Sequence, residues 1–82
     1  MKVDFLTMPG CSHCAFVRGV LAKVKADYPD LEVVEHDMTE EPELAGQYMV
    51  MSAPGLVIDG ELAFTGGVGE AELRERLDQA QA

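Results

Sequence analysis

The sequence predicts an α/β fold built in the order βαβαββα, with a mixed four-stranded sheet. Two observations carry this prediction. The first half of the chain has the pattern of strand, helix and strand, which gives parallel strands joined by a right-handed crossover. The second half contains an Asp-Gly pair between two short apolar runs, which is typical of an antiparallel hairpin. Eighty-two residues suffice for one core, so we expect a single domain spanning residues 1–82.

The first strand is expected at residues 2–7, which end at a Pro9-Gly10 turn. Apolar residues then recur at three- and four-residue steps, as they do along one face of a helix. Pro29 ends this pattern. The expected apolar face of the first helix consists of Phe16, Val17, Val20, Leu21, Val24 and Tyr28.

A second strand is expected at residues 31–36, where two valines lie between Glu32 and Glu35. Charged residues at these positions discourage pairing with a further strand, so we expect this strand at an edge of the sheet. A helix should follow, with Thr39 as its N-cap and Pro42 in its first turn, where the missing N–H costs nothing. The expected apolar side of this helix consists of Leu44, Ala45, Tyr48 and Met49.

The C-terminal third of the chain should form a hairpin and a helix. Asp59 and Gly60 can supply the two positive φ angles of a type I′ turn, between strands at residues 56–58 and 62–64. A Gly-Gly pair then ends the second of these strands. A last helix is expected from about residue 70. Its expected apolar face consists of Leu73, Leu77 and Ala80.

The charge of the chain limits its partners. Fifteen acidic and six basic residues give a net charge of −9. Binding through neutralised phosphates needs the opposite charge, and anionic membranes would repel this surface. We therefore expect neither nucleic acid nor a membrane as a partner. The first residues contain no apolar run long enough for a secretion signal, which predicts a cytoplasmic protein, and we expect a monomer.

The two cysteines, Cys11 and Cys14, stand where the first helix is expected to begin. Residues at i and i+3 lie on one helix face roughly 5 Å apart, within the Cα separation that a disulfide allows. In a cytosolic chain such a pair is typical of redox or metal chemistry. The unpaired N–H groups and the dipole of the helix start favour the Cys11 thiolate. We therefore expect Cys11 to attack a disulfide and Cys14 to resolve the product.

His13 lies between the cysteines, directly before Cys14. Histidine is the side chain that changes its charge near neutral pH. A protonated ring beside Cys11 would stabilise the reduced protein and make the disulfide more oxidising. We expect His13 to tune the redox couple, and the alternative is a solvent-exposed histidine with little influence.

Two stretches of the sequence resemble one superfamily. TMPGCSHC, residues 7–14, is similar to the T-x-P-G-C-P-Y-C motif of glutaredoxins and to the wider thioredoxin superfamily. YMVMSAPGLVI, residues 48–58, is similar to the superfamily's Y-x-V-x-x-x-P stretch. The short length and the Ala-Pro-Gly-Leu run look closer to small archaeal and bacterial glutaredoxin-like thioredoxins. The resemblance implies a thioredoxin fold, with helices on both faces of the sheet.

The resemblance also implies an activity and assigns residues to it. Cys11 becomes the nucleophile, Cys14 the resolving thiol and Pro54 a cis-proline beside them. In the family, the backbone before that proline pairs with the substrate as an added strand, which assigns substrate binding to Ala53 and Pro54. The implied protein is a thiol-disulfide oxidoreductase that acts on disulfide-containing proteins through a redox-active Cys11–Cys14 disulfide, without another cofactor.

Two reductants are considered for this activity. Glutaredoxins carry a basic residue before the Pro-Gly that helps bind the carboxylates of glutathione, whereas this chain has Met8. Gly66-Gly67 resembles the glutaredoxin G-G-x-D-D loop, which assigns substrate binding to Gly67, but the acidic pair of that loop is absent. The resemblance favours electrons from a thioredoxin-reductase-type flavoenzyme, with glutathione as the alternative.

Asp4 requires a separate interpretation. Val3-Asp4-Phe5 resembles the V-D-F of thioredoxins, whose buried aspartate accepts a proton from the resolving cysteine. Here Asp4 precedes Cys11 by seven residues instead of six, and one residue can change the face of a strand on which a side chain lies. We expect Asp4 at the surface or end of the strand, and the proton relay is the alternative.

Other functions remain open at this stage. A copper metallochaperone would bind Cu(I) with the two thiolates, but its element order, βαββαβ, differs from the predicted one. A zinc site would need Cys11, Cys14, His13 and His36 close together, and a single C-x-x-C does not predict that, so we expect no metal. In a protein-interaction module the cysteines would be incidental.

Overall fold

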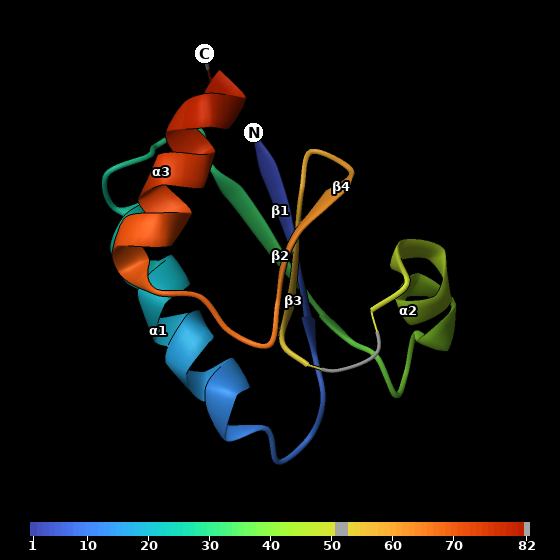
Figure 1. Cartoon of the computed structure of the whole chain (residues 1–82). Coiled ribbons are helices and arrows are strands. Elements are labelled where there is room, and N and C mark those ends of the chain that lie inside the picture. The colour runs from blue at the N-terminus through green and yellow to red at the C-terminus, as the bar shows by residue number, and fades with distance from the viewer. Residues whose placement is uncertain (51–52, 82) are drawn as a thin grey trace.

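The computed structural model describes residues 1–50 and 53–81 (Figure 1). In this part of the chain the elements follow the predicted order βαβαββα. No helix within it combines the length and the apolar composition that a membrane crossing requires. The bounds are Lys2–Thr7 for β1, Ser12–Lys25 for α1, Glu32–Asp37 for β2, Pro42–Tyr48 for α2, Gly55–Ile58 for β3, Glu61–Thr65 for β4 and Glu70–Gln81 for α3.

The four strands form one mixed sheet in the order β2-β1-β3-β4. β1 pairs in parallel with β2 and antiparallel with β3, and β3 pairs antiparallel with β4. The prediction of an edge position for the second strand is therefore confirmed. β1 lies inside the sheet, so both sides of its backbone form ladder hydrogen bonds.

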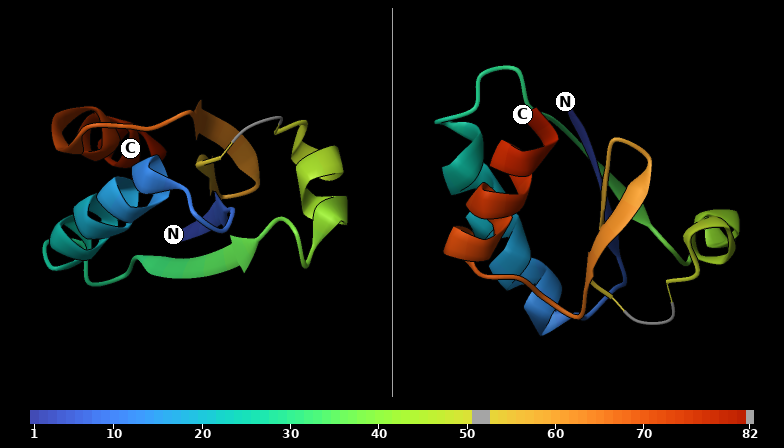
Figure 2. Two further views of the ribbon diagram at one scale, coloured as in Figure 1. Left: turned by 90° about the horizontal axis from the view of Figure 1, so that it is seen from below. Right: turned by 45° about the horizontal axis from the view of Figure 1, so that its top comes forward.

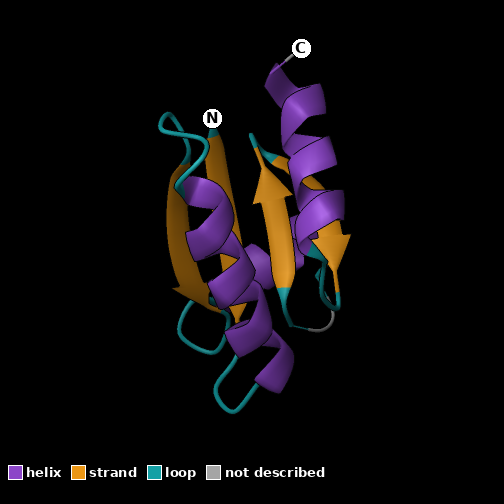
Figure 3. Ribbon diagram, turned by 90° about the vertical axis from the view of Figure 1, so that its left-hand side faces the viewer, coloured by secondary structure: helices purple, strands orange, loops and turns teal. Residues whose placement is uncertain are grey.

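The helices cover both faces of the sheet, with α1 and α3 side by side on one face and α2 on the other (Figures 2 and 3). Alternate residues of a strand point to opposite faces. Val3 and Phe5 of β1 therefore join the larger core against α1 and α3, whereas Leu6 joins the smaller core against α2. The larger core consists of Val3, Phe5, Cys14, Val17, Val20, Leu21, Val24, Leu31, Leu56, Ile58, Val68, Leu73 and Leu77.

The Asp-Gly turn has the predicted geometry. Asp59 and Gly60 have φ angles of 49° and 87°, which are the two positive values of a type I′ turn. The Asp59 carboxylate also accepts a hydrogen bond of 2.8 Å from the backbone N–H of Lys2. This bond fastens the β3–β4 turn to the start of β1.

Parts of the first helix differ from the prediction. Phe16 was expected in the core, but 61% of it is exposed, because it lies beside the helix face that the buried Cys14, Val17 and Leu21 share. The helix ends at Lys25, before Pro29, and Tyr28 lies in the turn that follows. The Tyr28 hydroxyl donates a hydrogen bond of 2.6 Å to Asp78 of α3, so its ring links the two helices.

The second helix also departs from the prediction at both ends. The Thr39 N-cap was wrong, since the Thr39 hydroxyl donates to Asp37 instead, at 2.6 Å. Glu41 is the N-cap and Pro42 opens the helix. Met49 was expected on the apolar side, but it is 81% exposed, because it caps the C-terminus in a left-handed conformation with φ of 57°.

A partly buried network of hydrogen bonds connects the N-cap of α2 to the sheet. His36 of β2 bonds to Asp4 of β1 through Nε2 at 3.0 Å and to Glu41 through Nδ1 at 2.9 Å. Partial burial lowers the pKa of His36, but the hydrogen bonds and charges of the two carboxylates outweigh this effect and raise the pKa above its ordinary value. A protonated His36 can donate to both carboxylates at once, whereas a neutral ring can donate to only one.

This network predicts that the free energy of unfolding decreases as the pH rises above about 6.5. The pKa of His36 is higher in the folded than in the unfolded protein, so its contribution is complete below the unfolded-state pKa and disappears as the pH passes the folded-state pKa. Loss of a charged hydrogen bond corresponds to a decrease on the order of 1 kcal/mol. Urea unfolding at a series of pH values measures it.

The control is His36→Gln, which does not titrate and should give a flatter pH profile. His13 is present in both proteins, so the comparison isolates His36. Equal pH dependence in the two proteins would contradict the role assigned to His36.

Candidate active site

One end of the sheet brings together the segments that the two sequence motifs contain. The register of β1 and β3 pairs Leu6 with Gly55. The residues next to this pair, Thr7 and Pro54, are therefore level with each other at the same end. β1 leads from there through Gly10, whose φ of 73° suits glycine, into the start of α1. Met51 and Ser52, inside the second motif, lie outside the described residues.

Cys11 is the N-cap of α1. Its backbone is extended, with φ of −84° and ψ of 111°, and its sulfur accepts a hydrogen bond of 3.1 Å from the backbone N–H of Cys14. A cysteine here takes the place of the serine or aspartate that commonly caps a helix. The N–H donor and the positive end of the helix dipole both interact more strongly with a thiolate than with a thiol.

Cys14 lies one turn further on and is only 2% exposed, within the larger core. Cys11 is half-buried. The first turn of the helix thus presents one accessible sulfur that accepts a backbone hydrogen bond and one sheltered sulfur on the same face. This is the arrangement that a nucleophile and a resolving thiol require.

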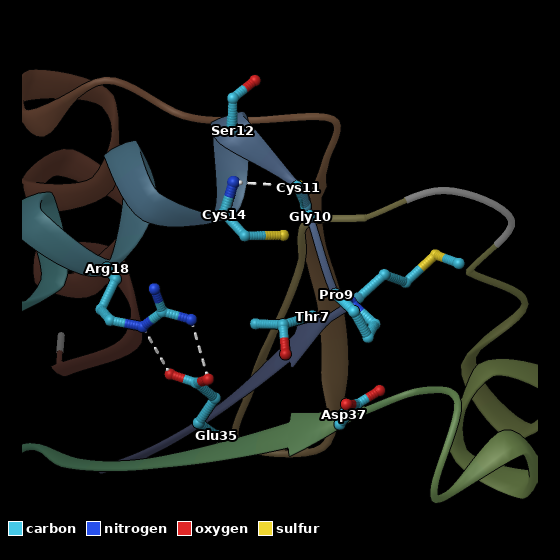
Figure 4. Close-up of a pocket in the computed structure, with 10 residues that line it drawn as sticks. Thr7, Pro9, Gly10, Cys11, Ser12, Cys14, Arg18, Glu35 and Asp37 are labelled. Atoms are coloured by element: carbon cyan, nitrogen blue, oxygen red, sulfur yellow. Dashed lines mark hydrogen bonds and ion pairs between the residues drawn. The ribbon is translucent and has the colours of Figure 1, made fainter.

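A groove of about 450 Å³ opens beside the cysteines (Figure 4). It runs between the β1–α1 loop, the first half of α1 and the end of β2. The residues that line it are Thr7, Met8, Pro9, Gly10, Cys11, Ser12, Cys14, Arg18, Glu35 and Asp37.

Arg18 and Glu35 form an ion pair on one wall of this groove (Figure 4). The guanidinium donates through Nε and Nη2 to the two carboxylate oxygens, each at 2.8 Å. These hydrogen bonds lower the pKa of Glu35, so it stays charged. The Arg18 guanidinium carbon also lies 5.8 Å from the centre of the Phe5 ring. The one basic side chain in the groove lining is therefore already bound within the protein.

Asp37 lies at the end of β2, across the groove from the cysteines (Figure 4). Its Oδ1 accepts hydrogen bonds from the Thr39 hydroxyl at 2.6 Å and from the Thr39 N–H at 2.8 Å. These hydrogen bonds lower the pKa of Asp37. The groove therefore contains a fixed carboxylate in addition to the ion pair.

Ala53 and Pro54 directly precede β3 and are joined by a cis peptide bond. Pro54 is buried and Ala53 packs against both cores. The Pro54 carbonyl accepts a hydrogen bond of 2.8 Å from the N–H of Gly66, after β4. This hydrogen bond places the loop after β4 at the same end of the sheet as the cysteines. Gly67 follows in that loop, with φ of 123°, and is exposed.

The remaining candidates lie elsewhere. His13 is exposed on the first turn of α1 and does not line the groove. Asp4 faces α2 and bonds to His36, on the face opposite Cys14, because side chains alternate along β1. The relay alternative for Asp4 is therefore wrong, and the surface or strand-end alternative also needs correction, since Asp4 is mid-strand and only 16% exposed.

The four residues of the zinc alternative do not come together, since both ring nitrogens of His36 bond to carboxylates on the α2 face. Among the described residues, no group of three or more His, Cys, Asp or Glu side chains is placed to hold a metal.

Sequence reasoning missed three residues of the groove, Arg18, Glu35 and Asp37. Their spacing contained a usable signal. Arg18 is four residues after Cys14, which places it on the same helix face one turn later. Glu35 and Asp37 alternate along β2 and so share one face of the strand. What the spacing could not show is that the helix face and the strand face meet.

Comparisons with known proteins agree with this geometry. The family model described as a thioredoxin domain matches residues 1–78. A thioredoxin of Methanocaldococcus jannaschii is 32% identical over 78 residues, which cover 94% of this chain and 92% of the relative.

Solved structures give the same result. Mitochondrial thioredoxin 3 of Saccharomyces cerevisiae in its oxidized form has a TM-score of 0.77 and 26% identity, over 95% of this chain and 76% of that one. A structure described as that of a malarial protein shares the fold, with a TM-score of 0.82 at 17% identity over 99% of this chain and 97% of the other.

The family assignment follows from the extent of these matches. The family model spans residues 1–78, and the relative from M. jannaschii covers most of both proteins. The element order is βαβαββα, which differs from the βαββαβ order of copper metallochaperones. The chain therefore belongs to the thioredoxin family, and it is a thiol-disulfide oxidoreductase.

Proposed function

We propose that Cys11 and Cys14 are the redox-active dithiol and that they reduce disulfides in proteins. The observation that carries this proposal is the hydrogen bond from the Cys14 N–H to the Cys11 sulfur at the helix start. It favours the thiolate at the more accessible of the two cysteines. Attack by this thiolate on a substrate disulfide forms one S–S bond, breaks another and releases the first substrate thiolate, which takes up a proton.

The second step returns the substrate. Cys14 loses its proton and attacks the Cys11 sulfur of the mixed disulfide, which forms the Cys11–Cys14 bond and releases the second substrate thiol. In total the protein dithiol loses two electrons and two protons, and the substrate disulfide gains them. Burial of Cys14 keeps the resolving thiol away from external disulfides, so the order of attack is fixed by exposure.

The proposed substrate site is the backbone of Ala53 and Pro54 together with the loop at Gly67. Two features support it: the register that sets Pro54 level with the end of β1, and the Gly66 hydrogen bond to Pro54. An extended substrate segment can pair with a backbone at this position as an added strand. Such pairing uses main-chain groups, so it suits substrates of varied sequence.

The proposed reductant is a thioredoxin-reductase-type flavoenzyme in the cytoplasm. Glutathione carries two carboxylates, and its recognition needs cations or free N–H donors near the cysteines. Arg18 is the one basic residue in the groove lining, and Glu35 occupies its guanidinium with two hydrogen bonds. The groove also contains the Asp37 carboxylate, which repels an anionic tripeptide.

His13 is proposed to tune the couple from outside the groove. It is exposed on the first helical turn, directly before Cys14. A protonated ring there adds positive charge near the Cys11 sulfur and favours the reduced protein. Because the ring is exposed, solvent screening keeps this effect small.

Replacing the cysteines separates their two roles. Cys11→Ser should abolish reduction of a disulfide-bonded reporter protein, because a serine hydroxyl is not ionised at neutral pH. Cys14→Ser should attack normally but stop at the mixed disulfide, which then accumulates with one substrate chain per protein. Mass spectrometry after acid quenching detects the adduct. Ala15→Ser, an exposed change in the same helix outside the groove lining, is the matched control and should retain the wild-type rate.

The reductant is tested by NADPH consumption in two coupled assays. With thioredoxin reductase the rate should exceed that with glutathione and glutathione reductase by at least about tenfold, because electrostatic complementarity controls association. Met8→Lys places a free cation in the groove and should increase the glutathione-coupled rate severalfold. Comparable rates with the two systems for the wild-type protein would overturn the choice of reductant.

The role of His13 is tested by the reduction potential of the couple, measured at pH 6 and at pH 9. His13→Ala should lower the potential by about 10 mV, since 30 mV corresponds to about 1.4 kcal/mol and an exposed charge contributes a fraction of that. At pH 9 the difference should vanish. An unchanged potential at pH 6 would leave His13 as a surface residue without a role.

A further inference from the structure

We propose that the groove beside Cys11 selects disulfide segments that carry a lysine or arginine near the target cysteine, and that Asp37 is the specificity-determining residue. This inference rests on the proposed function, because it concerns the substrates of the same cysteines. It adds a charge preference to a backbone-pairing site that by itself accepts many sequences.

The first support is the position of the basic residues. Of the six basic residues in the chain, only Arg18 lines the groove. Its Nε and Nη2 groups both donate hydrogen bonds to Glu35. Lys2 begins β1 at the far end of the sheet and lies 3.8 Å from Asp4. Lys23 and Lys25 lie in the last turn of α1, away from the cysteines at its start. The two remaining basic residues are Arg74 and Arg76 of α3, each within 4 Å of an acidic side chain.

The second support is the state of the Asp37 carboxylate. Thr39 fixes it through two hydrogen bonds, and both bonds go to Oδ1. Among the residues that the structure describes, no basic side chain forms an ion pair with Asp37. The groove therefore contains a carboxylate that is held in place and has no cation of the protein bound to it.

The third support is the surrounding charge. The turn after β2 contains Glu40 within three residues of Asp37, and the whole chain has a net charge of −9. Figure 4 shows Asp37 on the wall opposite the cysteines, so a long side chain of a substrate bound at Cys11 can extend across the groove toward it. A lysine or arginine would gain a partner for its charge there, and a glutamate would be repelled.

The test uses three synthetic peptides that differ only in the residue beside their single cysteine, which is lysine, glutamine or glutamate. Each cysteine is linked as a mixed disulfide to 2-thiopyridine, whose release is followed by absorbance after mixing with pre-reduced protein. At low salt the rate constant should be about fivefold higher for the lysine peptide than for the glutamate peptide, with glutamine between them. The ratio should decrease as salt is added.

Asp37→Asn should reduce the lysine-to-glutamate ratio to less than about twofold, because the amide oxygen can still accept from Thr39 while the charge is lost. Asp30→Asn is the matched control. It removes the same charge from an exposed turn at the far end of α1, and it should keep the wild-type ratio. A thermal melt of each variant verifies folding.

The outcomes separate this inference from the proposed function. Equal rate constants for the three peptides with the wild-type protein would overturn the charge preference while leaving the thiol-disulfide activity intact. Equal loss of the ratio in Asp30→Asn and Asp37→Asn would overturn the role of Asp37, since overall charge would then explain it. Failure to release thiopyridine from any peptide would instead contradict the function itself.

Discussion

The antiparallel register between β1 and β3 is the constraint on which the active site depends. It is fixed by burial on both faces of the sheet, since Phe5 and Leu56 pack against α1 and α3 while Leu6 and Val57 pack against α2. A slip by one residue would exchange the two faces and expose both sets of side chains. Because the register is fixed, Pro54 is held level with the end of β1, where the chain turns toward the cysteines.

The first turn of α1 combines stability and reactivity in two neighbouring positions. Cys11 satisfies a backbone N–H that every helix start leaves unpaired, and Cys14 fills part of the larger core. The same hydrogen bond that caps the helix stabilises the thiolate.

Charge is distributed unequally between the two ends of the sheet. Five of the six basic residues lie away from the groove, and the sixth, Arg18, is neutralised by Glu35. The cysteine end therefore presents carboxylates, apolar side chains and backbone groups. This distribution is the basis of the proposed preference for polypeptide partners with complementary charge over small anionic thiols.

The sequence by itself determined the element order, the edge position of β2 and the type I′ turn, because these depend on periodicity and turn chemistry within short segments. It also placed both cysteines at the start of α1, where the structure has them. It could not determine which side of β1 Asp4 faces, that Phe16 and Met49 are exposed, or that Thr39 bonds to Asp37 instead of capping α2. Those outcomes depend on which element covers each face. The groove formed by Arg18, Glu35 and Asp37 required the tertiary structure for the same reason, since its walls come from a helix and a strand that only packing brings together.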